Sequence, residues 1–247
     1  MNDDLIMKIK YLRLSGLAAN LDRYLKKATE KNFSHIRFLK SIIEEEYEIK
    51  IENSKKLRIH RAKIPEKWII ESFPFNRQPH LNKKKIINIY DNFDYMTHTQ
   101  NIIFLGPTGV GKTGLATAFL IQAIHRGYNG RFIHFPELIE NLYRSKADHS
   151  EEKVMKTFVS FDCLLIDELG YVEVDPVQVG LFFKLMSKRH KNKTTLITTN
   201  LGFEKWPKFL KNDHITAALI DRLTETSHVI NMRKCVSLRA KLNSHSD

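Results

Sequence analysis

Long apolar runs are missing from this sequence. No stretch approaches eighteen uninterrupted apolar residues, which argues against a helix that spans a membrane. The first residues, Met-Asn-Asp-Asp, lack the basic segment and apolar run that begin a secretory signal peptide. We therefore expect a cytoplasmic protein with no membrane partner.

Cysteine is also scarce: the 247 residues include two, Cys163 and Cys235. Two cysteines provide no framework of disulfide bridges, and they suit a reducing compartment. The eleven histidines are scattered, and neither H-E-x-x-H nor C-x-x-C occurs. The chain also lacks internal repeats and low-complexity tracts. We predict neither a disulfide scaffold nor a metal site built from histidine and cysteine.

A glycine-rich motif follows the apolar stretch 101–105 and matches G-x-x-x-x-G-K-[ST] in full. Its residues are Gly106, Pro107, Thr108, Gly109, Val110, Gly111, Lys112 and Thr113, and a helical pattern begins near Lys112. The glycines let the backbone turn so that N–H groups face a β-phosphate, and the helix adds the positive end of its dipole. The motif predicts a nucleoside triphosphate site; the alternative is a glycine-rich surface turn.

Two side chains of this motif have predicted roles beyond the backbone cradle. Lys112 is expected to contact the β- and γ-phosphates of ATP, and Thr113 to hold Mg²⁺ through its hydroxyl. We include Gly114, the next residue, among those that contact the nucleotide. This Mg²⁺ is the one metal ion that we expect.

Two acids, Asp167 and Glu168, end a short apolar run about 55 residues after the glycine-rich motif. The run indicates a buried parallel strand. In a P-loop protein, Asp167 would lie beside Thr113 and order the Mg²⁺ shell, and Glu168 would polarise the attacking water. The alternative is that the acids only end a strand before Gly170.

A third apolar run, residues 194–200, is dense in β-branched residues and ends in Asn200. Ligands of open α/β sheets bind at the carboxyl ends of the strands, where Asn200 could hydrogen-bond the water or the γ-phosphate. Alternatively, Asn200 only caps the turn before Gly202.

The formal net charge of +12 is the main indication of a partner. The basic surplus is spread over residues 1–100 and over the rest of the chain. Such a surplus suits a polyanion such as DNA, held mainly through its phosphates. The alternative is that the lysines belong to ordinary solvated helix faces.

The first part of the chain is predicted to be helical. Apolar residues recur there at near-helical spacing, with a break at Ser15-Gly16: Leu5, Ile9, Leu12, Leu17, Leu21 and Leu25. Ser34 is the expected N-cap of a further helix that runs to about Lys63, ahead of Pro65. The basic second half of this helix suits a nucleic-acid backbone or a partner.

The rest of the chain alternates strands with helices. Residues 68–85 indicate a connector, because Pro74, Pro79 and the lysines 83–85 interrupt any periodicity, and helical spacing resumes at 86–96. Beyond the motifs, strands are expected at 131–135 and 228–232, with helices starting at Pro136, Ser150 and Pro176. This alternation predicts an α/β fold, a parallel sheet covered by helices on both faces.

We therefore divide the chain into three parts. Residues 1–67 form a small N-terminal helical domain for contact with a partner or DNA, and residues 68–100 form a connector and a helix. Residues 101–247 form the nucleotide-binding domain. A chain of this length with 42% apolar residues can bury one α/β core and a small appendage.

Taken together, the motifs resemble those of the IstB-like family, AAA+ ATPases that help insertion-sequence transposases and are close relatives of the DnaC helicase loaders. The resemblance rests on residues 106–113, 165–171, 198–206 and 220–223, and on the N-terminal segments 14–17, 43–46, 61–65 and 73–75. Two positions depart from the family pattern. Gly114 stands where His is common, and residues 235–239 replace a more usual Gly-Glu-Ser-Tyr-Arg.

The resemblance implies an ATP site that two protomers share. AAA+ ATPases place each site at an interface where the neighbour supplies an arginine, and Arg222 matches this trans arginine finger. The structural alternative is an ion pair of Arg222 with Asp221 or Glu225. Arg239 is a weaker candidate, for an arginine that senses nucleotide in cis.

The resemblance further implies an ATPase that forms homo-oligomers on duplex DNA and recruits or activates a transposase. Two alternatives remain open. The protein could instead load a replicative helicase, or be a basic DNA-binding module that holds nucleotide without hydrolysing it.

Overall fold

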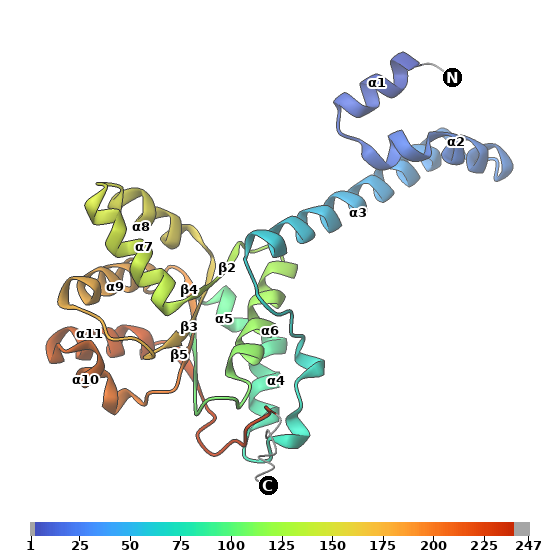
Figure 1. The fold of residues 1–247 in the computed structure, drawn as a ribbon. Helices are drawn as coiled ribbons and strands as arrows, with labels where there is room; N and C mark the ends of the chain where they lie inside the picture. Colours follow the sequence, from blue (N-terminus) through green and yellow to red (C-terminus); the bar gives the residue numbers. More distant parts are fainter. Residues whose placement is uncertain (1–2, 240–247) are drawn as a thin grey trace, which may run out of the picture. The chain divides into compact units, whose positions relative to one another are not determined.

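The computed structural model describes residues 3–239 and divides into two compact units, Met1–Leu57 and Arg58–Asp247. Residues of each unit contact mainly other residues of the same unit. Figure 1 shows the helices and strands of both units. Among the described residues, no helix combines the length and apolar character needed to cross a membrane.

The first unit consists of α1 (Asp3–Tyr11), α2 (Ser15–Glu30) and α3 (His35–Arg61) as far as Leu57. The carboxylate of Glu46 on α3, 4% exposed, accepts a 2.7 Å hydrogen bond from the backbone N–H of Leu17 at the start of α2. Gly16 permits this approach, because a Cβ there would lie 2.4 Å from Ile49. The break between the two helices lies at residues 12–14, just before the expected Ser15-Gly16, and these two residues begin α2.

The apolar stripe predicted for this unit is only partly buried. Ile9 and Leu21 are buried, whereas Leu5, Leu12 and Leu25 are exposed. Apolar packing within this unit is therefore supplemented by polar support. An ion pair between Arg23 and Glu45 supplies part of it.

The helix cap expected at Ser34 is present, and its hydroxyl accepts a 3.4 Å hydrogen bond from the N–H of Arg37. The helix ends at Arg61, two residues before the predicted end. Pro65 lies in an irregular segment after the helix, where its missing N–H interrupts no helical hydrogen bond.

The connector contains two short 3₁₀ helices, η1 (Ile70–Ser72) and η2 (Phe75–Arg77), followed by α4 (Lys83–Asn92) and α5 (Asp94–Thr97). Two details correct the sequence interpretation. The lysines 83–85 form the first turn of α4, because the side chain of Asn82 caps the helix through the N–H of Lys85. The predicted helix 86–96 is interrupted at Phe93, which adopts a left-handed φ of +64°.

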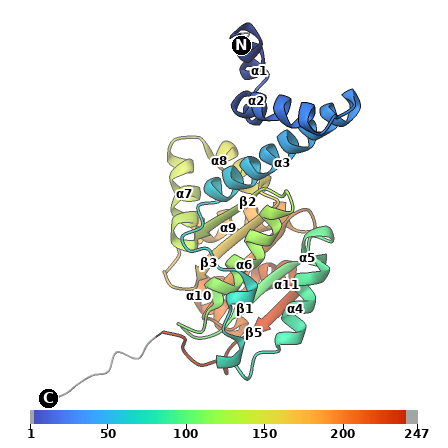
Figure 2. The same ribbon diagram turned by 90° about the vertical axis from the view of Figure 1, so that its right-hand side faces the viewer.

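Five parallel strands form one sheet in the order β2-β3-β4-β1-β5 (Figure 2). They are β1 (Asn101–Leu105), β2 (Gly130–His134), β3 (Cys163–Leu169), β4 (Thr194–Thr199) and β5 (Ser227–Asn231). β3 and β4 lie inside the sheet and are buried along almost their whole length. This sheet confirms the predicted α/β class.

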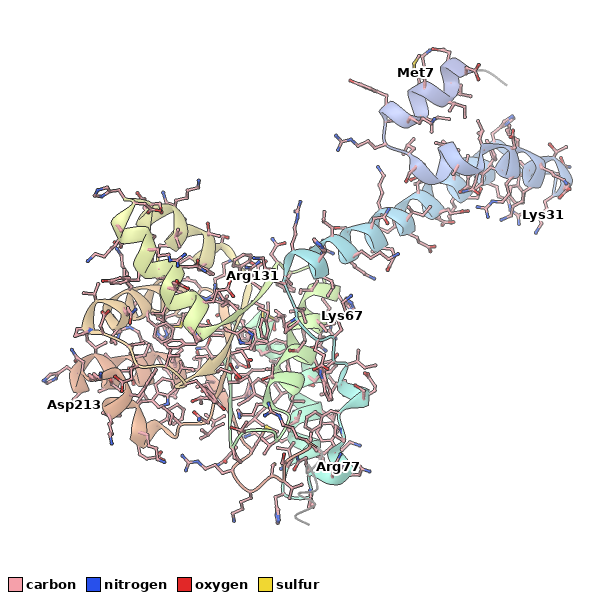
Figure 3. All side chains as sticks on the ribbon, in the orientation of Figure 1. Met7, Lys31, Lys67, Arg77, Arg131 and Asp213 are labelled. Atoms are coloured by element: carbon pink, nitrogen blue, oxygen red, sulfur yellow. The ribbon has the colours of Figure 1, made fainter. Side chains whose placement is uncertain are left out.

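Helices cover both faces of the sheet. The remaining elements are α6 (Lys112–His125), α7 (Phe135–Ala147), α8 (Glu151–Ser160), α9 (Pro176–Arg189), η3 (Phe203–Lys205), α10 (Trp206–Leu210) and α11 (Asp213–Thr224). Successive strand residues point to opposite faces, so Ile102 packs with α4 and α6 while Ile103 packs with α7 and α9. Figure 3 shows the side chains of this unit gathered between sheet and helices.

Arg189, at the end of α9, is a charged residue inside this packing, 1% exposed. Its guanidinium donates to the carbonyls of Phe158 and Phe161, each at 2.8 Å, and to the carbonyl of Thr194. Burial lowers its pKa to about 10. The carbonyls that α8 leaves free at its end are thereby satisfied.

Candidate nucleotide-binding site

The glycine-rich motif forms the loop between β1 and α6. Gly109 and Gly111 have φ values of +82° and +93°, a region that residues with a side chain seldom occupy. The loop thus turns directly from a central strand into the N-terminus of a helix, which concentrates N–H groups and the positive end of the helix dipole.

Lys112 stands in the first turn of α6, 7% exposed. Its ammonium group donates a 2.8 Å hydrogen bond to the carbonyl of Pro107, within the loop. Burial lowers the pKa of Lys112, against the opposing effect of Asp167 and Glu168. The ammonium group is therefore held at a loop carbonyl, where an anion would satisfy its charge.

The predicted neighbours Thr113 and Asp167 are in contact. The Thr113 hydroxyl donates a 2.8 Å hydrogen bond to Asp167 Oδ1, and Thr198 on β4 donates one of 2.6 Å to the same oxygen. Asp167 is 1% exposed. A hydroxyl and a carboxylate side by side are oxygen ligands of the kind that Mg²⁺ prefers.

Glu168 has an unusual backbone for a residue with a long side chain. Its φ is +63°, and the pairing of β3 with β4 is irregular between Ile166 and Leu169. The N–H of Glu168 donates a 2.9 Å hydrogen bond to the Thr198 hydroxyl. This local turn carries the Glu168 side chain out of the sheet, where it is about half exposed (48%).

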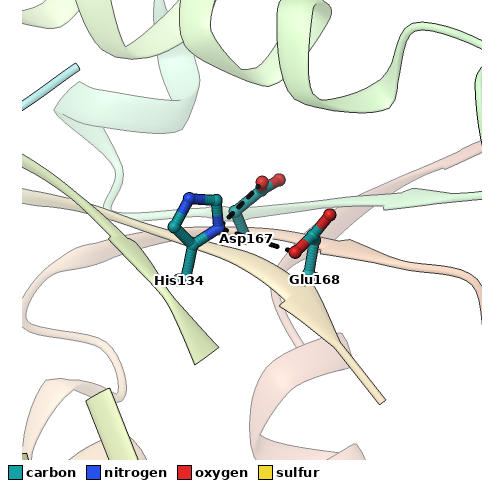
Figure 4. A group of neighbouring side chains, drawn as sticks. All are labelled: His134, Asp167 and Glu168. Carbon is teal, nitrogen blue, oxygen red and sulfur yellow. Dashed lines mark ion pairs between the residues drawn. The ribbon is translucent and has the colours of Figure 1, made fainter. Parts of the chain in front are cut away.

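His134, at the end of β2, lies beside both acids (Figure 4). Its Nδ1 is 3.5 Å from an Asp167 oxygen and 3.7 Å from a Glu168 oxygen. The three side chains bring one ligand atom each within 4.8 Å of one another. Sequence reasoning missed His134. Its position opposite Asp167 follows from the pairing of β2 with β3, which the sequence pattern does not reveal.

A cavity of about 290 Å³ lies over the loop and the acids. The predicted site residues that line it are Thr108, Gly109, Gly111, Lys112, Thr113, Gly114, Glu168 and Arg239. The motif residues Gly106, Pro107 and Val110 contribute loop backbone instead. Sequence reasoning did not single out Glu66, Trp68, Tyr171, Thr198 and Leu238, which also line the cavity.

Asp167, Asn200 and Arg222 do not line this cavity, although Asp167 is bonded to Thr113 and Thr198, which do. Asn200 is exposed just after β4, with its Oδ1 3.4 Å from a Cβ built on Gly170. Arg222 lies on α11, donates a 3.1 Å hydrogen bond to the Ala218 carbonyl and places its guanidinium 4.7 Å from the Phe183 ring. The alternative ion pair is not formed, because within residues 3–239 Arg222 pairs with neither Asp221 nor Glu225, and Glu225 pairs with Lys191 and His190.

The segment around Arg239 packs on the glycine-rich loop. The N–H of Leu238 donates a 2.8 Å hydrogen bond to the Gly109 carbonyl, and a Cβ on Gly109 would meet the Ser237 hydroxyl at 2.6 Å. Gln78 joins the two segments further, because its amide donates to the carbonyls of Val110 and Val236 at 3.2 and 2.7 Å. Arg239 therefore reaches the cavity in its own chain.

Comparisons with known proteins indicate a family of ATP-binding proteins. The family model of IstB-like ATP binding proteins matches residues 7–246. The ATP-binding protein of insertion sequence IS5376 from Geobacillus stearothermophilus is 30% identical over 222 residues, 90% of this chain and 88% of that protein. The corresponding protein of IS232 from Bacillus thuringiensis subsp. berliner is 29% identical over 228 residues, 92% of this chain and 91% of that protein.

The fold is similar to that of solved AAA+ proteins. A crystal structure of the DnaC helicase loader has a TM-score of 0.53 and 24% sequence identity, and the match covers 61% of this chain and 88% of that chain. The family is assigned from the family model and the two relatives, and the fold from the five-stranded parallel sheet. This chain belongs to the IstB-like family of ATP-binding proteins and has an AAA+ fold.

Proposed function

We propose that the protein hydrolyses Mg-ATP and uses the nucleotide to assemble on duplex DNA, where it recruits or activates a transposase. The observation that carries this proposal is the hydrogen-bonded group of Thr113, Asp167 and Thr198 beneath the glycine-rich loop, with Glu168 aimed out beside it. Phosphate cradle, metal ligands and base candidate thus meet at one edge of the sheet.

The chain's own residues suit both parts of Mg-ATP. Loop N–H groups and Lys112 provide positive charge for the phosphates, and the oxygens of Thr113 and Asp167 suit Mg²⁺, which supplies charge neutralisation when bound. Glu168, half exposed at the cavity, would orient and deprotonate a water molecule. Asn200, at the same end of the sheet, is proposed to hydrogen-bond that water or the γ-phosphate.

Arg222 is proposed to act on the site of a neighbouring protomer. It is absent from the lining of its own cavity, and its guanidinium lies on an aromatic ring without a carboxylate partner among residues 3–239. An arginine free of ion pairs is suited to stabilise the negative charge of a phosphoryl transition state. Arg239, which lines the cavity of its own chain, is proposed to sense bound nucleotide in cis.

DNA and transposase are the partners that we propose. The net charge of +12 favours a polyanion, and the related proteins named above are encoded by insertion sequences, which move by transposition. The N-terminal helices, residues 1–67, are the proposed contact with DNA or the transposase. The likeness to a helicase loader makes helicase loading the second candidate function.

Size analysis on duplex DNA tests the proposal, with ATP, ADP and no nucleotide compared. We expect large protein–DNA assemblies with ATP and small species in the other two conditions, because an array offers many more phosphate contacts than one protomer. Phosphate release in the same samples should rise when DNA is added. Equal DNA binding by monomers with ADP and with ATP would contradict nucleotide-driven assembly, and absence of phosphate release would leave a non-hydrolysing DNA-binding module.

A further inference from the structure

Trp68 lines the nucleotide cavity although it lies far from the sequence motifs. It follows Pro65 in the irregular segment after α3, and Glu66 from the same segment lines the cavity with it. The indole Nε1 donates a 2.9 Å hydrogen bond to Glu66 Oε2. The ring is thus held by a polar contact at one edge while it remains partly exposed.

The indole packs on Gly114. A Cβ built on Gly114 would lie 2.8, 3.1 and 3.2 Å from Cδ2, Cε2 and Cε3 of Trp68, three neighbouring atoms of the ring system. Gly114 is an ordinary helical residue whose φ is not positive, so the backbone there does not require glycine. The space that glycine leaves is filled by the indole, which accounts for the departure from the family pattern at this position.

Two aromatic side chains of the described residues, Tyr171 and Trp68, line the cavity. They contact different residues of the proposed nucleotide site. Tyr171 follows Glu168 by three residues, and its hydroxyl lies 3.0 Å from the Thr108 hydroxyl. Trp68 lies against Gly114, one residue beyond the proposed Mg²⁺ ligand Thr113. Tyr171 is therefore placed on the side of the attacking water, and Trp68 borders the space that remains for the nucleoside.

We propose that the indole of Trp68 stacks on the base of the bound nucleotide, with Glu66 as the residue that positions the ring. This inference rests on the proposed nucleotide site. Stacking needs an accessible aromatic face within reach of the phosphate cradle, and Trp68 meets both conditions. Because every base offers a π-face, this contact adds affinity without choosing the base.

The first test separates a contact with the base from a general effect on the loop. Calorimetry is used to measure the affinity of wild type and Trp68→Ala for Mg-ATP and for magnesium with inorganic triphosphate, which has no base. We expect Trp68→Ala to weaken ATP binding about tenfold, equivalent to about 1.4 kcal/mol, and to leave triphosphate binding unchanged. Trp68→Phe should retain most of the ATP affinity, because it keeps a ring.

The matched control is Ile69→Ala. Ile69 is the adjacent residue, 53% exposed and not part of the cavity lining, so its removal should leave the affinity for both ligands unchanged. An equal loss of ATP and triphosphate binding in Trp68→Ala would show that the indole only shapes the loop, which would overturn the stacking proposal.

Tryptophan emission provides a second readout that does not depend on a truncated variant. The chain has two tryptophans, and Trp206 is fully buried in the core on the face of α7 and α9. ATP should change the tryptophan emission of wild type, and inorganic triphosphate should not. The emission of Trp68→Phe should stay the same with either ligand. If wild type binds ATP but its emission and the affinity of Trp68→Ala are unaltered, stacking is wrong and the nucleotide site stands. If wild type binds neither ligand, both proposals fail.

Discussion

At the residue scale, the organisation of the site depends on one hydroxyl. Thr198 donates to Asp167 and accepts from the N–H of Glu168, so a single side chain fixes the metal ligand and the base candidate relative to each other. A hydroxyl can do both at once, since it has one donor and two lone pairs. The left-handed backbone of Glu168 is held in place by this bond.

Replacing Thr198 by valine preserves its shape and removes the hydroxyl. We expect Thr198→Val to bind ATP, because the loop is intact, but to hydrolyse it at least about tenfold more slowly, because Glu168 and Asp167 lose their common partner. The unpaired N–H should lower the free energy of unfolding by about 1–3 kcal/mol. Calorimetry, phosphate release and urea unfolding measure the three quantities.

Thr195→Val is the matched control. Thr195 is equally buried on the same strand and accepts a 3.1 Å hydrogen bond from Arg189, away from the cavity. It should lose stability but keep its hydrolysis rate. If both valine variants hydrolysed ATP at the wild-type rate, the role assigned to Thr198 would be wrong.

Substitutions of Lys112 and Glu168 should distinguish ATP binding from ATP hydrolysis. Lys112→Ala is expected to abolish measurable ATP binding, because the proposed role of its ammonium group is to contact the phosphates in the ground state. Glu168→Gln is expected to bind ATP as wild type does and to hydrolyse it about 10²–10⁴-fold more slowly, because the proposed role of Glu168 is to act only on the water. Normal turnover by Glu168→Gln would remove the base assignment.

At the scale of elements, one carboxylate joins three strands. Asp162, just before β3, accepts a 3.0 Å hydrogen bond from the N–H of Asn129, before β2, and one of 2.6 Å from Lys193, before β4. Burial acts to raise the pKa of Asp162, but the hydrogen bonds and the charge of Lys193 together lower it. The ionised form is therefore favoured in the folded state.

The lowered pKa of Asp162 sets how the free energy of unfolding depends on pH. Because the folded pKa lies below the unfolded value of about 3.9, the stabilisation is present above that value and is lost as the pH falls through the folded pKa. We expect Asp162→Asn to unfold about 1 kcal/mol more easily at pH 7, after allowance for solvent screening, and to approach wild type below pH 3. Urea unfolding at both pH values measures the difference.

Glu173→Gln is the control for this experiment, since Glu173 forms an exposed 3.0 Å ion pair with Lys211 and is 89% exposed. Its stability should match wild type at both pH values. A constant difference between wild type and Asp162→Asn from pH 7 to pH 3 would mean that the carboxylate charge is not what joins the strands.

The sequence predicted the elements that carry strong local signals. The contact of Thr113 with Asp167 was predicted because a P-loop and a strand that ends in acids imply a fixed geometry. The binding and catalytic roles expected of all the site residues, those of Asn200, Arg222 and Arg239 included, stay predictions. Thr198 and His134 were missed, because their places beside Asp167 follow from the strand order β2-β3-β4, which periodicity does not encode.

Tertiary contacts explain the errors in the helices. Phe93 breaks the predicted helix 86–96 because its ring, 4% exposed, is buried beneath the guanidinium of Arg126 at 4.1 Å and packs with Tyr128 at 5.7 Å. A left-handed backbone costs about 1–2 kcal/mol, which burial of a phenylalanine offsets. Composition suggested a connector at lysines 83–85, but exposed lysines are good helix formers once Asn82 provides a cap.

At the scale of the whole molecule, the proposed assembly requires a site shared between protomers. Arg222→Ala is expected to bind ATP nearly as well as wild type and to hydrolyse it about 10³-fold more slowly. Mixing Arg222→Ala with Lys112→Ala on DNA should restore part of the activity, because an intact pocket from the first can meet an intact arginine from the second. Phosphate release in mixtures of varied ratio measures the rescue.

The control is each variant alone on the same DNA, at the same total concentration. Both must be folded and must co-assemble, which circular dichroism and size analysis verify. Complete absence of rescue under these conditions would mean that Arg222 acts in cis or only on structure, and each protomer would then be a self-contained enzyme.

The end of the described chain also bears on how the protein should be handled. Leu238 and Gly109 are one hydrogen bond apart, and Gln78 clamps the same two segments. A deletion that begins at Val236 would therefore remove the segment that covers the phosphate loop, and a tag attached directly after Arg239 would stand beside that loop. A fusion at the N-terminal end leaves these hydrogen bonds intact and is the better design for any measurement of nucleotide affinity.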